Sequence, residues 1–463
     1  MISREIEKLI YVSLIVILSI IFIFIGKGAN EFVMGASLIL FYIYFFRSVS
    51  RPLNVTGGIS TFMKIDVFFM LFYYMIYYYP YQLYLLGLYD LHEQMWSYFT
   101  YVEYSNRAMI MSNIGLVSFM FGFSTKKYDK QEAIKMNGRL LSRLSIIFAL
   151  LMLLITVLFV ISGGVLMFVG VYAGSDTGDI TSNAIFSLVS FFYILGGIHS
   201  IYVYYKTKKT PLISWVIILA VAIWCFLLLF LGDRNTFFIL AIALSGGVFT
   251  FLRGIKRITI VFFVFIGMFL YNVVEVSRSL DDKSIDNVIE SFTDSNQSEK
   301  NDYGANSFNT TTIGCRASLA IVPEKKDFFY GKFKLVSLTS LVPYSSRLFF
   351  DDSDVLLGSS AVLTDEMIGL TADWGVGTNI LSDCYMDFGL IGVIFFMIVL
   401  GFYGGYIKNT LLRNPENIKT FFLYIIIMAY YSEIARYGID FPLRSIVWTI
   451  LIFNFIRLNQ RKK

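Results

Sequence analysis

Charged residues are scarce in this sequence: only 15% of its 463 residues are Asp, Glu, Lys or Arg, whereas 57% are hydrophobic. The mean hydropathy is +0.67. Because a soluble globular domain carries about 25% charged residues, the composition excludes the soluble class and indicates an integral membrane protein. The formal net charge of +5 is small and implies no nucleic-acid partner.

Histidine and cysteine are also scarce, with two and three copies. His92 and His199 fit neither a Cys-His metal set nor a Ser-His-Asp triad, and we expect His199 to be packed or hydrogen-bonded inside a helix bundle. Cys315 and Cys384 both fall in a segment predicted below to lie outside the cytoplasm, where a disulfide can survive. Two unpaired thiols are favoured, with a bridge as the alternative.

About twelve apolar runs are long enough, or nearly so, to cross a bilayer as helices. The first run, 9–25, ends without a small-residue cleavage site, so we expect a retained span and not a signal peptide. No internal repeat is visible, and we expect one all-α polytopic membrane domain covering residues 1–463. The predicted spans are 8–26, 31–46, 65–86, 105–123, 144–168, 184–205, 212–231, 235–252, 258–276, 388–407, 420–436 and 443–456.

Lysine and arginine are concentrated in alternate loops. About 24 of the 38 such residues lie in short loops on one side of the predicted spans. Because cytoplasmic loops are enriched in these cations, both termini are predicted to face the cytoplasm. The cations on this side occur within residues 4–8, 47–64, 126–143, 206–209, 253–257, 408–419 and 457–463.

One large loop, residues 277–387, is predicted on the other side, between the ninth and tenth spans. Within it, 284–292 has helical apolar spacing suited to the membrane surface, and 294–312 is polar and predicted as a loop. Apolar runs too short to cross return at 328–350 and predict short helices packed on the outer ends of the spans. The acidic run 351–354 resembles a metal-ligand run, but a solvated loop is favoured, and no metal or cofactor is predicted.

Arginines on the predicted outer side are the main chemical signal, because the distribution of cations disfavours them there. One explanation is that each pairs with a nearby acid, as Asp233 would with Arg234. The other is an anionic substrate, which the set as a whole favours because guanidinium groups bind phosphate oxygens in pairs. The outer arginines are Arg107, Arg234, Arg278, Arg316, Arg347, Arg436 and Arg444.

Carboxylates near the same boundary are candidates for a general base, because partial burial can bring their pKa into a useful range. The sequence does not choose among them, and most are expected to be structural partners of arginine. The candidates are Asp233, Glu275, Asp383, Asp387, Glu433 and Asp440.

Three local patterns accompany this arrangement of spans. Gly232-Asp233-Arg234 stands at the outer end of a span, Phe328-Phe329-Tyr330-Gly331 is followed by Leu341-Val342-Pro343, and residues 375–392 lead from the large loop back into the membrane. With them, the chain resembles the O-antigen polymerase (Wzy) family of bacterial surface-polysaccharide assembly over nearly its whole length. It departs from the family pattern after the loop proline, where Tyr344 stands in place of a frequent arginine.

The resemblance implies a fold like the GT-C-like fold of polymerases and ligases, with short helices in the large outer loop. It implies a glycosyltransferase of the bacterial inner membrane that polymerises undecaprenyl-diphosphate-linked repeat units of O-antigen or a related surface polysaccharide, at the periplasmic face and without a metal or cofactor. The expected partners are these lipid-linked glycans and membrane lipids, and the resemblance also allows a chain-length regulator protein.

Roles follow from the resemblance and from the need to stabilise leaving-group charge and deprotonate an acceptor hydroxyl. Arg316 and Arg347, from the large loop, are expected to act as gates or acceptor-side contacts. The expected catalytic residues are Asp233, Arg234, Tyr385, Asp387 and Glu433. The expected diphosphate-binding residues are Arg234, Arg278, Arg316, Arg347, Arg436 and Arg444.

Two other functions compete. A lipid-linked oligosaccharide flippase or other transporter also fits twelve spans, but it would carry charges near the membrane midplane and needs no large one-sided loop. An O-antigen ligase-like glycosyltransferase is the second alternative, although the large loop contains no histidine, which ligases of this kind carry there. Metal-dependent lipid-sugar transferases of the familiar type have an acidic motif in a large first outer loop, which here is only 26–31.

Overall fold

The computed structural model describes most of the chain. The described residues are 4–55, 59–92, 100–129, 136–164, 180–231, 233–260, 262, 267, 307–342, 345, 349–350, 358–369 and 375–461. Several predictions lie outside them: most of the ninth span at 258–276, the surface helix at 284–292, the acidic run 351–354, and Arg278 and Arg347.

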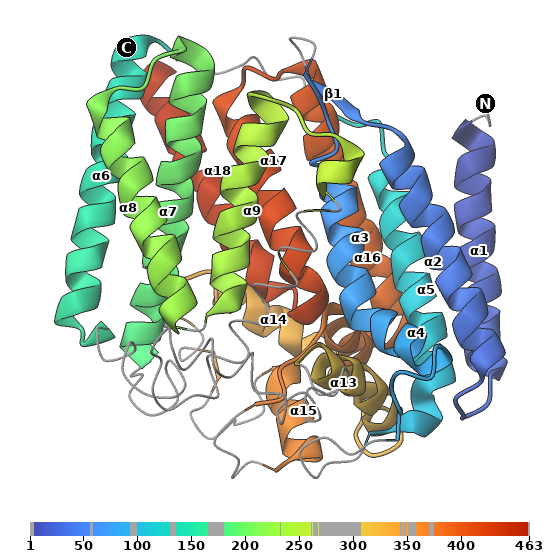
Figure 1. Cartoon of the computed structure of the whole chain (residues 1–463). Helices are drawn as coiled ribbons and strands as arrows, with labels where there is room; N and C mark the ends of the chain where they lie inside the picture. Colours follow the sequence, from blue (N-terminus) through green and yellow to red (C-terminus); the bar gives the residue numbers. More distant parts are fainter. Residues whose placement is uncertain are drawn as a thin grey trace, which may run out of the picture.

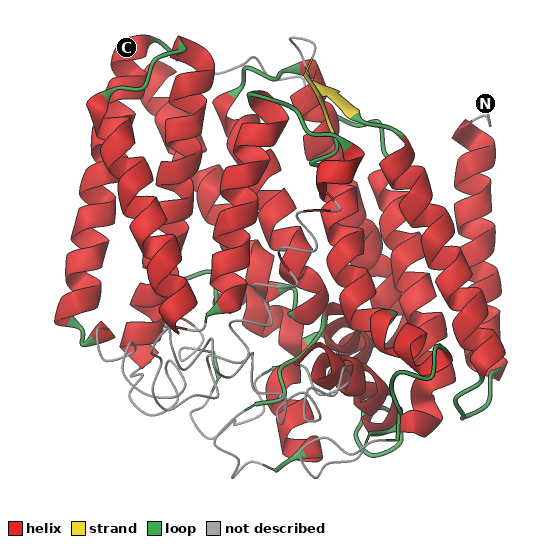
Figure 2. Ribbon diagram, in the orientation of Figure 1, coloured by secondary structure: helices red, strands yellow, loops and turns green. Residues whose placement is uncertain are grey.

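Helices make up nearly all of the described structure, as Figure 2 shows. The N-terminal half contains α1 (Arg4–Phe24), α2 (Glu31–Ser50), α3 (Ile65–Tyr77), α4 (Tyr79–Leu85), the 3-10 turn η1 (Val102–Tyr104), α5 (Ser105–Phe123), α6 (Gly138–Ile161), α7 (Ile180–Thr207), α8 (Leu212–Leu231) and α9 (Arg234–Phe251). The C-terminal half contains α13 (Ser307–Ile321), α14 (Lys332–Thr339), α15 (Ser359–Met367), α16 (Ile380–Arg413), α17 (Ile418–Glu433), the 3-10 turn η4 (Ile434–Arg436) and α18 (Asp440–Arg461).

The two ends of the bundle differ. Figure 1 places both termini at one end, together with a small antiparallel hairpin of β1 (Leu53–Val55) and β2 (Ile59–Thr61), in which Asn54 faces Ser60. The short helices α13, α14 and α15 lie at the opposite end. This arrangement agrees with both termini sharing one side and the large loop lying on the other. Which end faces the cytoplasm stays a prediction.

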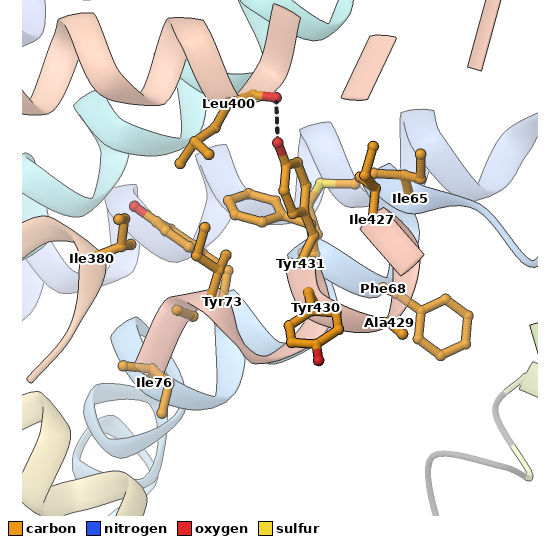
Figure 3. Packing of buried hydrophobic residues seen from close by; sticks show 14 of the residues in the cluster. Ile65, Phe68, Tyr73, Ile76, Ile380, Leu400, Ile427, Ala429, Tyr430 and Tyr431 are labelled. Atoms are coloured by element: carbon orange, nitrogen blue, oxygen red, sulfur yellow. Dashed lines mark hydrogen bonds between the residues drawn. The ribbon is translucent and has the colours of Figure 1, made fainter. Parts of the chain in front are cut away.

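Helix α17 forms the centre of the bundle, and nearly all of its residues are buried. It packs against α3, α9, α16 and α18. Figure 3 shows part of this packing, in which the Tyr431 hydroxyl donates a hydrogen bond of 3.1 Å to the Leu400 carbonyl oxygen. By contrast, α1, α6 and α8 expose many large apolar side chains, such as Leu150 and Leu219. In a bilayer such surfaces face lipid.

Helices α5 and α16 approach each other closely, and glycines make the approach possible. A Cβ atom on Gly401 would lie 2.0 Å from the Phe119 carbonyl oxygen, and one on Gly122 would lie 2.1 Å from the Ile398 carbonyl oxygen. Small residues at such crossings allow two backbones in a membrane bundle to pack against each other.

Eight of the described helices are long and apolar enough to cross a membrane: α1, α2, α6, α7, α8, α9, α16 and α17. Three further predicted spans are also helical. The third span is formed by α3 and α4 together, the fourth by α5 and the last by α18, but each is too short or too polar to count as a membrane-crossing helix by this measure. Helix α5 shows why. It is buried along almost its whole length, so its polar residues bond inside the bundle: Asn113 accepts from the Tyr78 hydroxyl and donates to Ser37. The count of twelve spans stays a prediction.

The structure corrects three details. The third span is broken at Tyr78, where α3 ends and α4 begins with Pro80 near its start. The polar segment 294–312 is not a loop throughout, because α13 starts at Ser307. The tenth span starts early, at Ile380, and bends at Phe388 and Gly389, next to its predicted start at 388.

The predictions for His199 and the cysteines are confirmed. His199 is fully buried, and its Nε2 atom lies 3.0 Å from the Ser145 hydroxyl. Cys315 and Cys384 are both buried and free.

The close crossing of α5 and α16 can be tested with Gly401→Ala. The added methyl group would collide with the backbone of α5, and overpacking of this kind costs about 1 to 3 kcal/mol. We expect a lower unfolding temperature for the purified protein in detergent, measured by tryptophan fluorescence. Gly35→Ala is the control, because nothing lies within 4 Å of its added Cβ. Equal unfolding temperatures for the two variants would contradict the packing described.

Candidate active site

The segment Asp233–Thr236 starts α9. Asp233 is the N-cap: its carboxylate accepts from the Thr236 backbone N–H at 3.2 Å and from the Thr236 hydroxyl at 2.6 Å. Arg234 is the first residue of the helix and is only 2% exposed. Asp233 is therefore engaged in capping the helix, while Arg234 lies at the positive end of its dipole.

The end of α17 meets this segment. Arg436 follows α17 in η4, and its Nη1 donates to the Asn235 side-chain oxygen at 3.0 Å. The charges of Arg436, Arg234 and Asp233 all act on the Glu433 carboxylate, which is 4% exposed. Arg436 and the buried Glu433 thus lie with Arg234, about 200 positions earlier in the sequence, where α9 and α17 pack together.

Tyr437 belongs to the same group. Burial raises the pKa of its hydroxyl, although the nearby Arg436 opposes the shift. Arg234, Glu433 and Asp233 also act on this hydroxyl. The group is therefore one electrostatic unit in which each charge affects the others.

A buried tyrosine positions the turn that carries Arg436. The Tyr77 hydroxyl of α3 lies 2.9 Å from the Asn379 side-chain oxygen and 3.1 Å from the Ala435 carbonyl oxygen. Asn379 is the N-cap of α16 and accepts from the Ser382 backbone N–H at 2.9 Å. The residue before Arg436 is thus held against the start of α16.

A second polar group lies at the start of α16. The Lys334 ammonium is 2.7 Å from Asp383 and 3.3 Å from Asp387. Burial alone would lower the pKa of Lys334, but the Asp383 and Asp387 carboxylates outweigh it and raise that pKa. These residues form a buried ion-pair group, which we call the lysine junction: Lys334, Asp383 and Asp387.

Asp387 also caps α14. Its carboxylate accepts from the backbone N–H groups of Gly331, Phe333 and Lys334, each at 3.2 Å, and the residue is fully buried. Because its oxygens are engaged by these donors and by the lysine, the geometry favours an anchoring role for Asp387 and not the role of base.

The lysine junction joins two of the patterns singled out in the sequence. The backbone N–H groups of Phe329 and Tyr330 donate to the carbonyl oxygens of Met386 and Asp387, at 3.0 and 2.9 Å. Gly331 has a φ of +93°, and a Cβ atom there would lie 2.8 Å from the Phe388 ring. Glycine thus allows the outer loop to turn directly against the bend of α16.

The other predicted residues lie elsewhere. Arg444 donates from Nε to the Ser340 carbonyl oxygen at 3.0 Å, next to the end of α14. Arg316 is completely buried on α13, with Nη1 3.5 Å from the Ser105 hydroxyl. Tyr385 packs between the rings of Phe22 and Phe328, each with a centroid distance of 6.1 Å. Arg278 and Arg347 lie outside the described residues.

Lys334 was not among the residues predicted from the sequence, where the outer arginines were the only cations singled out. A lysine on the outer side is disfavoured for the same reason as an arginine, so the same signal would have found it.

Comparison with known families decides among the functions that the sequence left open. The family model described as O-antigen polysaccharide polymerase Wzy matches residues 9–461. The chain belongs to this family. It is therefore a multi-pass membrane enzyme that polymerises lipid-linked repeat units by glycosyl transfer. No curated protein and no solved structure matches the chain.

Membership of the O-antigen polymerase family confirms the resemblance and decides against the transporter and the ligase. The roles of individual residues and the likeness to the GT-C-like fold stay predictions. Within the polymerase, the described structure brings Arg234 and Arg436 together with Glu433 and assigns Asp387 to a different group.

The lysine junction predicts a specific effect of Asp387→Ala. Removing one partner of a buried ion pair costs about 3 to 5 kcal/mol, and here α14 also loses its cap. We expect at least tenfold faster amide hydrogen exchange in residues 332–339, measured by mass spectrometry. Asp327→Ala, an exposed acid in the same outer segment, is the control and should leave α14 protected. Unchanged exchange in Asp387→Ala would remove the anchoring role.

Proposed function

We propose that this polymerase transfers the growing glycan from its undecaprenyl-diphosphate carrier to the non-reducing end of an incoming lipid-linked repeat unit. The reaction takes place at the end of the bundle that carries α13, α14 and α15. This end faces the periplasm, both termini face the cytoplasm, and the membrane is the bacterial inner membrane. The observation that carries the proposal is the meeting of Arg234, Arg436 and Glu433 at the ends of α9 and α17.

In this proposal, Arg234 and Arg436 bind the diphosphate of the donor. Cleavage of a sugar-diphosphate bond develops negative charge on the leaving group, and fixed cations lower its energy. Guanidinium groups suit this task because they present paired donors to phosphate oxygens. Arg234 also lies at a helix N-terminus, where the backbone dipole favours an anion. Arg278 and Arg347 are proposed as further diphosphate ligands.

Arg444 and Arg316 have contacts of their own in the structure. Arg444 is proposed to steady the end of α14 beside the site, because its Nε is bound to the Ser340 carbonyl. Arg316 is proposed as an acceptor-side contact that exchanges its weak approach to Ser105, 3.5 Å, for a ligand oxygen.

Glu433 is the proposed general base that deprotonates the acceptor hydroxyl. Two other carboxylates predicted as candidate bases already cap helices: Asp233 caps α9, and Asp387 caps α14. Among the described residues, none donates a hydrogen bond to the Glu433 carboxylate, in contrast to Asp233 and Asp387. Its position beside both arginines places it next to the proposed donor diphosphate.

The diphosphate site predicts that Arg234→Ala and Arg436→Ala abolish polymer and leave single repeat units. Polymer length is measured on gels of extracted surface polysaccharide, with the abundance of the membrane-inserted protein checked in parallel. Arg253→Ala is the matched control, because Arg253 is an exposed arginine just beyond the opposite end of α9. Wild-type chain lengths in the Arg234 and Arg436 variants would remove both residues from the site.

The role of Glu433 predicts a defect in the chemical step. General-base catalysis contributes about 10² to 10⁴ in rate, so Glu433→Gln should lower kcat by at least roughly 100-fold with little change in KM for the lipid-linked unit. The measurement is polymerisation by the purified enzyme in detergent or nanodiscs. Glu366→Gln, an acid on α15 at the same end of the bundle, should keep the wild-type kcat. A Glu433→Gln enzyme with wild-type kcat would show that another group is the base.

A further inference from the structure

A pocket of about 520 Å³ lies apart from Arg234 and Arg436, between the connection that follows α1, the end of α4 and the turn η1. It lies at the same end of the bundle as α13 and α15. Small-molecule sites in proteins have volumes of about 300 to 1,000 Å³, so the pocket has room for a small ligand. It is lined by Gly28, Ala29, Tyr84, His92, Thr100, Tyr101, Val102 and Glu103.

The walls of this pocket are held by hydrogen bonds between two segments. The Gly28 backbone N–H donates to the Glu103 carbonyl oxygen at 2.5 Å, and the Asn106 backbone N–H donates to the Gly28 carbonyl oxygen at 3.0 Å. The Asn106 side chain then accepts from the Asn30 backbone N–H at 2.8 Å. The connection between α1 and α2 is therefore fixed against η1, and a ligand would enter a site that needs little ordering.

The lining combines aromatic rings with polar groups. The lining includes two tyrosines, Tyr84 and Tyr101, and two exposed polar residues, His92 and Glu103. Tyr101 has a left-handed backbone with a φ of +50°, a conformation that a tyrosine adopts at a cost in energy and that is concentrated at functional sites. Aromatic surface beside hydrogen-bonding groups matches a pyranose ring, which has apolar C–H faces and a rim of hydroxyl groups.

No lysine or arginine is among the described residues that line the pocket, although Arg107, four positions after Glu103, acts on the nearby Glu324 carboxylate. Lys27 precedes the lining residue Gly28, but its ammonium is paired with Glu324 at 2.9 Å, and the Tyr104 hydroxyl donates to the same carboxylate at 2.6 Å. The hydrogen bonds from Tyr104 and Lys27 lower the pKa of Glu324, so it stays ionised and paired at neutral pH. Glu103, an exposed acid, lines the pocket, and a carboxylate there would repel a phosphate and accept hydrogen bonds from hydroxyl groups.

We propose that this pocket binds a sugar ring of the lipid-linked repeat unit, apart from the diphosphate. The inference rests on the proposed function, because a polymerase must hold two glycan substrates while their carrier groups are held elsewhere. Glu103 and His92 bond the sugar hydroxyl groups, and the rings of Tyr84 and Tyr101 cover its apolar faces. The pocket recognises the sugar portion, and the arginines recognise the phosphates.

The test uses the full-length polymerase in detergent and one defined probe. The probe is the single repeat-unit oligosaccharide, released by mild acid from the lipid that accumulates in cells lacking this polymerase. Saturation-transfer difference NMR reports which sugar protons contact the protein, and a titration gives Kd. We expect binding by the wild type and at least a fivefold higher Kd for Glu103→Gln and for Tyr84→Leu. Glu103→Gln keeps the size of an exposed side chain, so it preserves folding.

Two controls separate this inference from the proposed function. Glu31→Gln changes an exposed acid at the same end of the bundle that does not line the pocket, and it should bind the oligosaccharide as the wild type does. Arg234→Ala should also bind it normally, because the probe carries no phosphate. Failure of the arginine site would therefore leave this binding intact. A wild-type protein that does not bind the probe, or variants at Glu103 and Tyr84 with unchanged Kd, would overturn the proposal.

Discussion

A guanidinium group at the end of a membrane helix must contact an acid, a polar group or water, because hydrocarbon offers it nothing. Arg436 satisfies this requirement through Asn235, on a different helix. Since α17 is buried along its length, the turn after it lies against the start of α9. The same packing that forms the core therefore brings Glu433 and Arg436 to Arg234, and the proposed reaction depends on this contact.

A second constraint fixes the outer segments to the bundle. α16 starts at Ile380, bends at Gly389 and ends at Arg413. It contacts the outer helices α13, α14 and α15. The Asp387 carboxylate accepts hydrogen bonds from the first backbone N–H groups of α14, and the Lys334 ammonium forms an ion pair with Asp383. Two carboxylates that look alike in the sequence thus differ in their surroundings: Asp387 is engaged by several donors, whereas no donor to Glu433 is found among the described residues, and two arginines act on it.

The sequence predicted the elements better than their contacts. The span at 212–231 coincides with α8, because a continuous apolar run bounded by polar residues defines a membrane helix locally. The span at 105–123 also coincides with α5, although polar residues such as Asn113 interrupt its apolar sequence. The roles of the charged residues depend on partners that are far away. Asp387 bonds to residues 53 to 56 positions earlier, and Arg436 to one 201 positions earlier. No local pattern carries that information, so Asp387 and Glu433 stood as equal candidates for the base. Helix α13 was also missed in part, because its Thr-rich start is typical of a loop.

Charge also differs between the two proposed binding regions, and in the proposed reaction this difference would orient the substrate. A lipid-linked repeat unit is anionic at the diphosphate and rich in hydroxyl groups along the glycan. In the proposed arrangement, Arg234 and Arg436 would attract the diphosphate, whereas a carboxylate at Glu103 would repel it and accept hydrogen bonds from the hydroxyl groups of the glycan. A substrate bound in the reverse direction would place its diphosphate beside Glu103 and leave the arginines without an anion. Because both regions lie at the same end of the bundle, a glycan can occupy the tyrosine-lined pocket while a diphosphate stays with the arginines, and this selects one direction of binding before any bond is made.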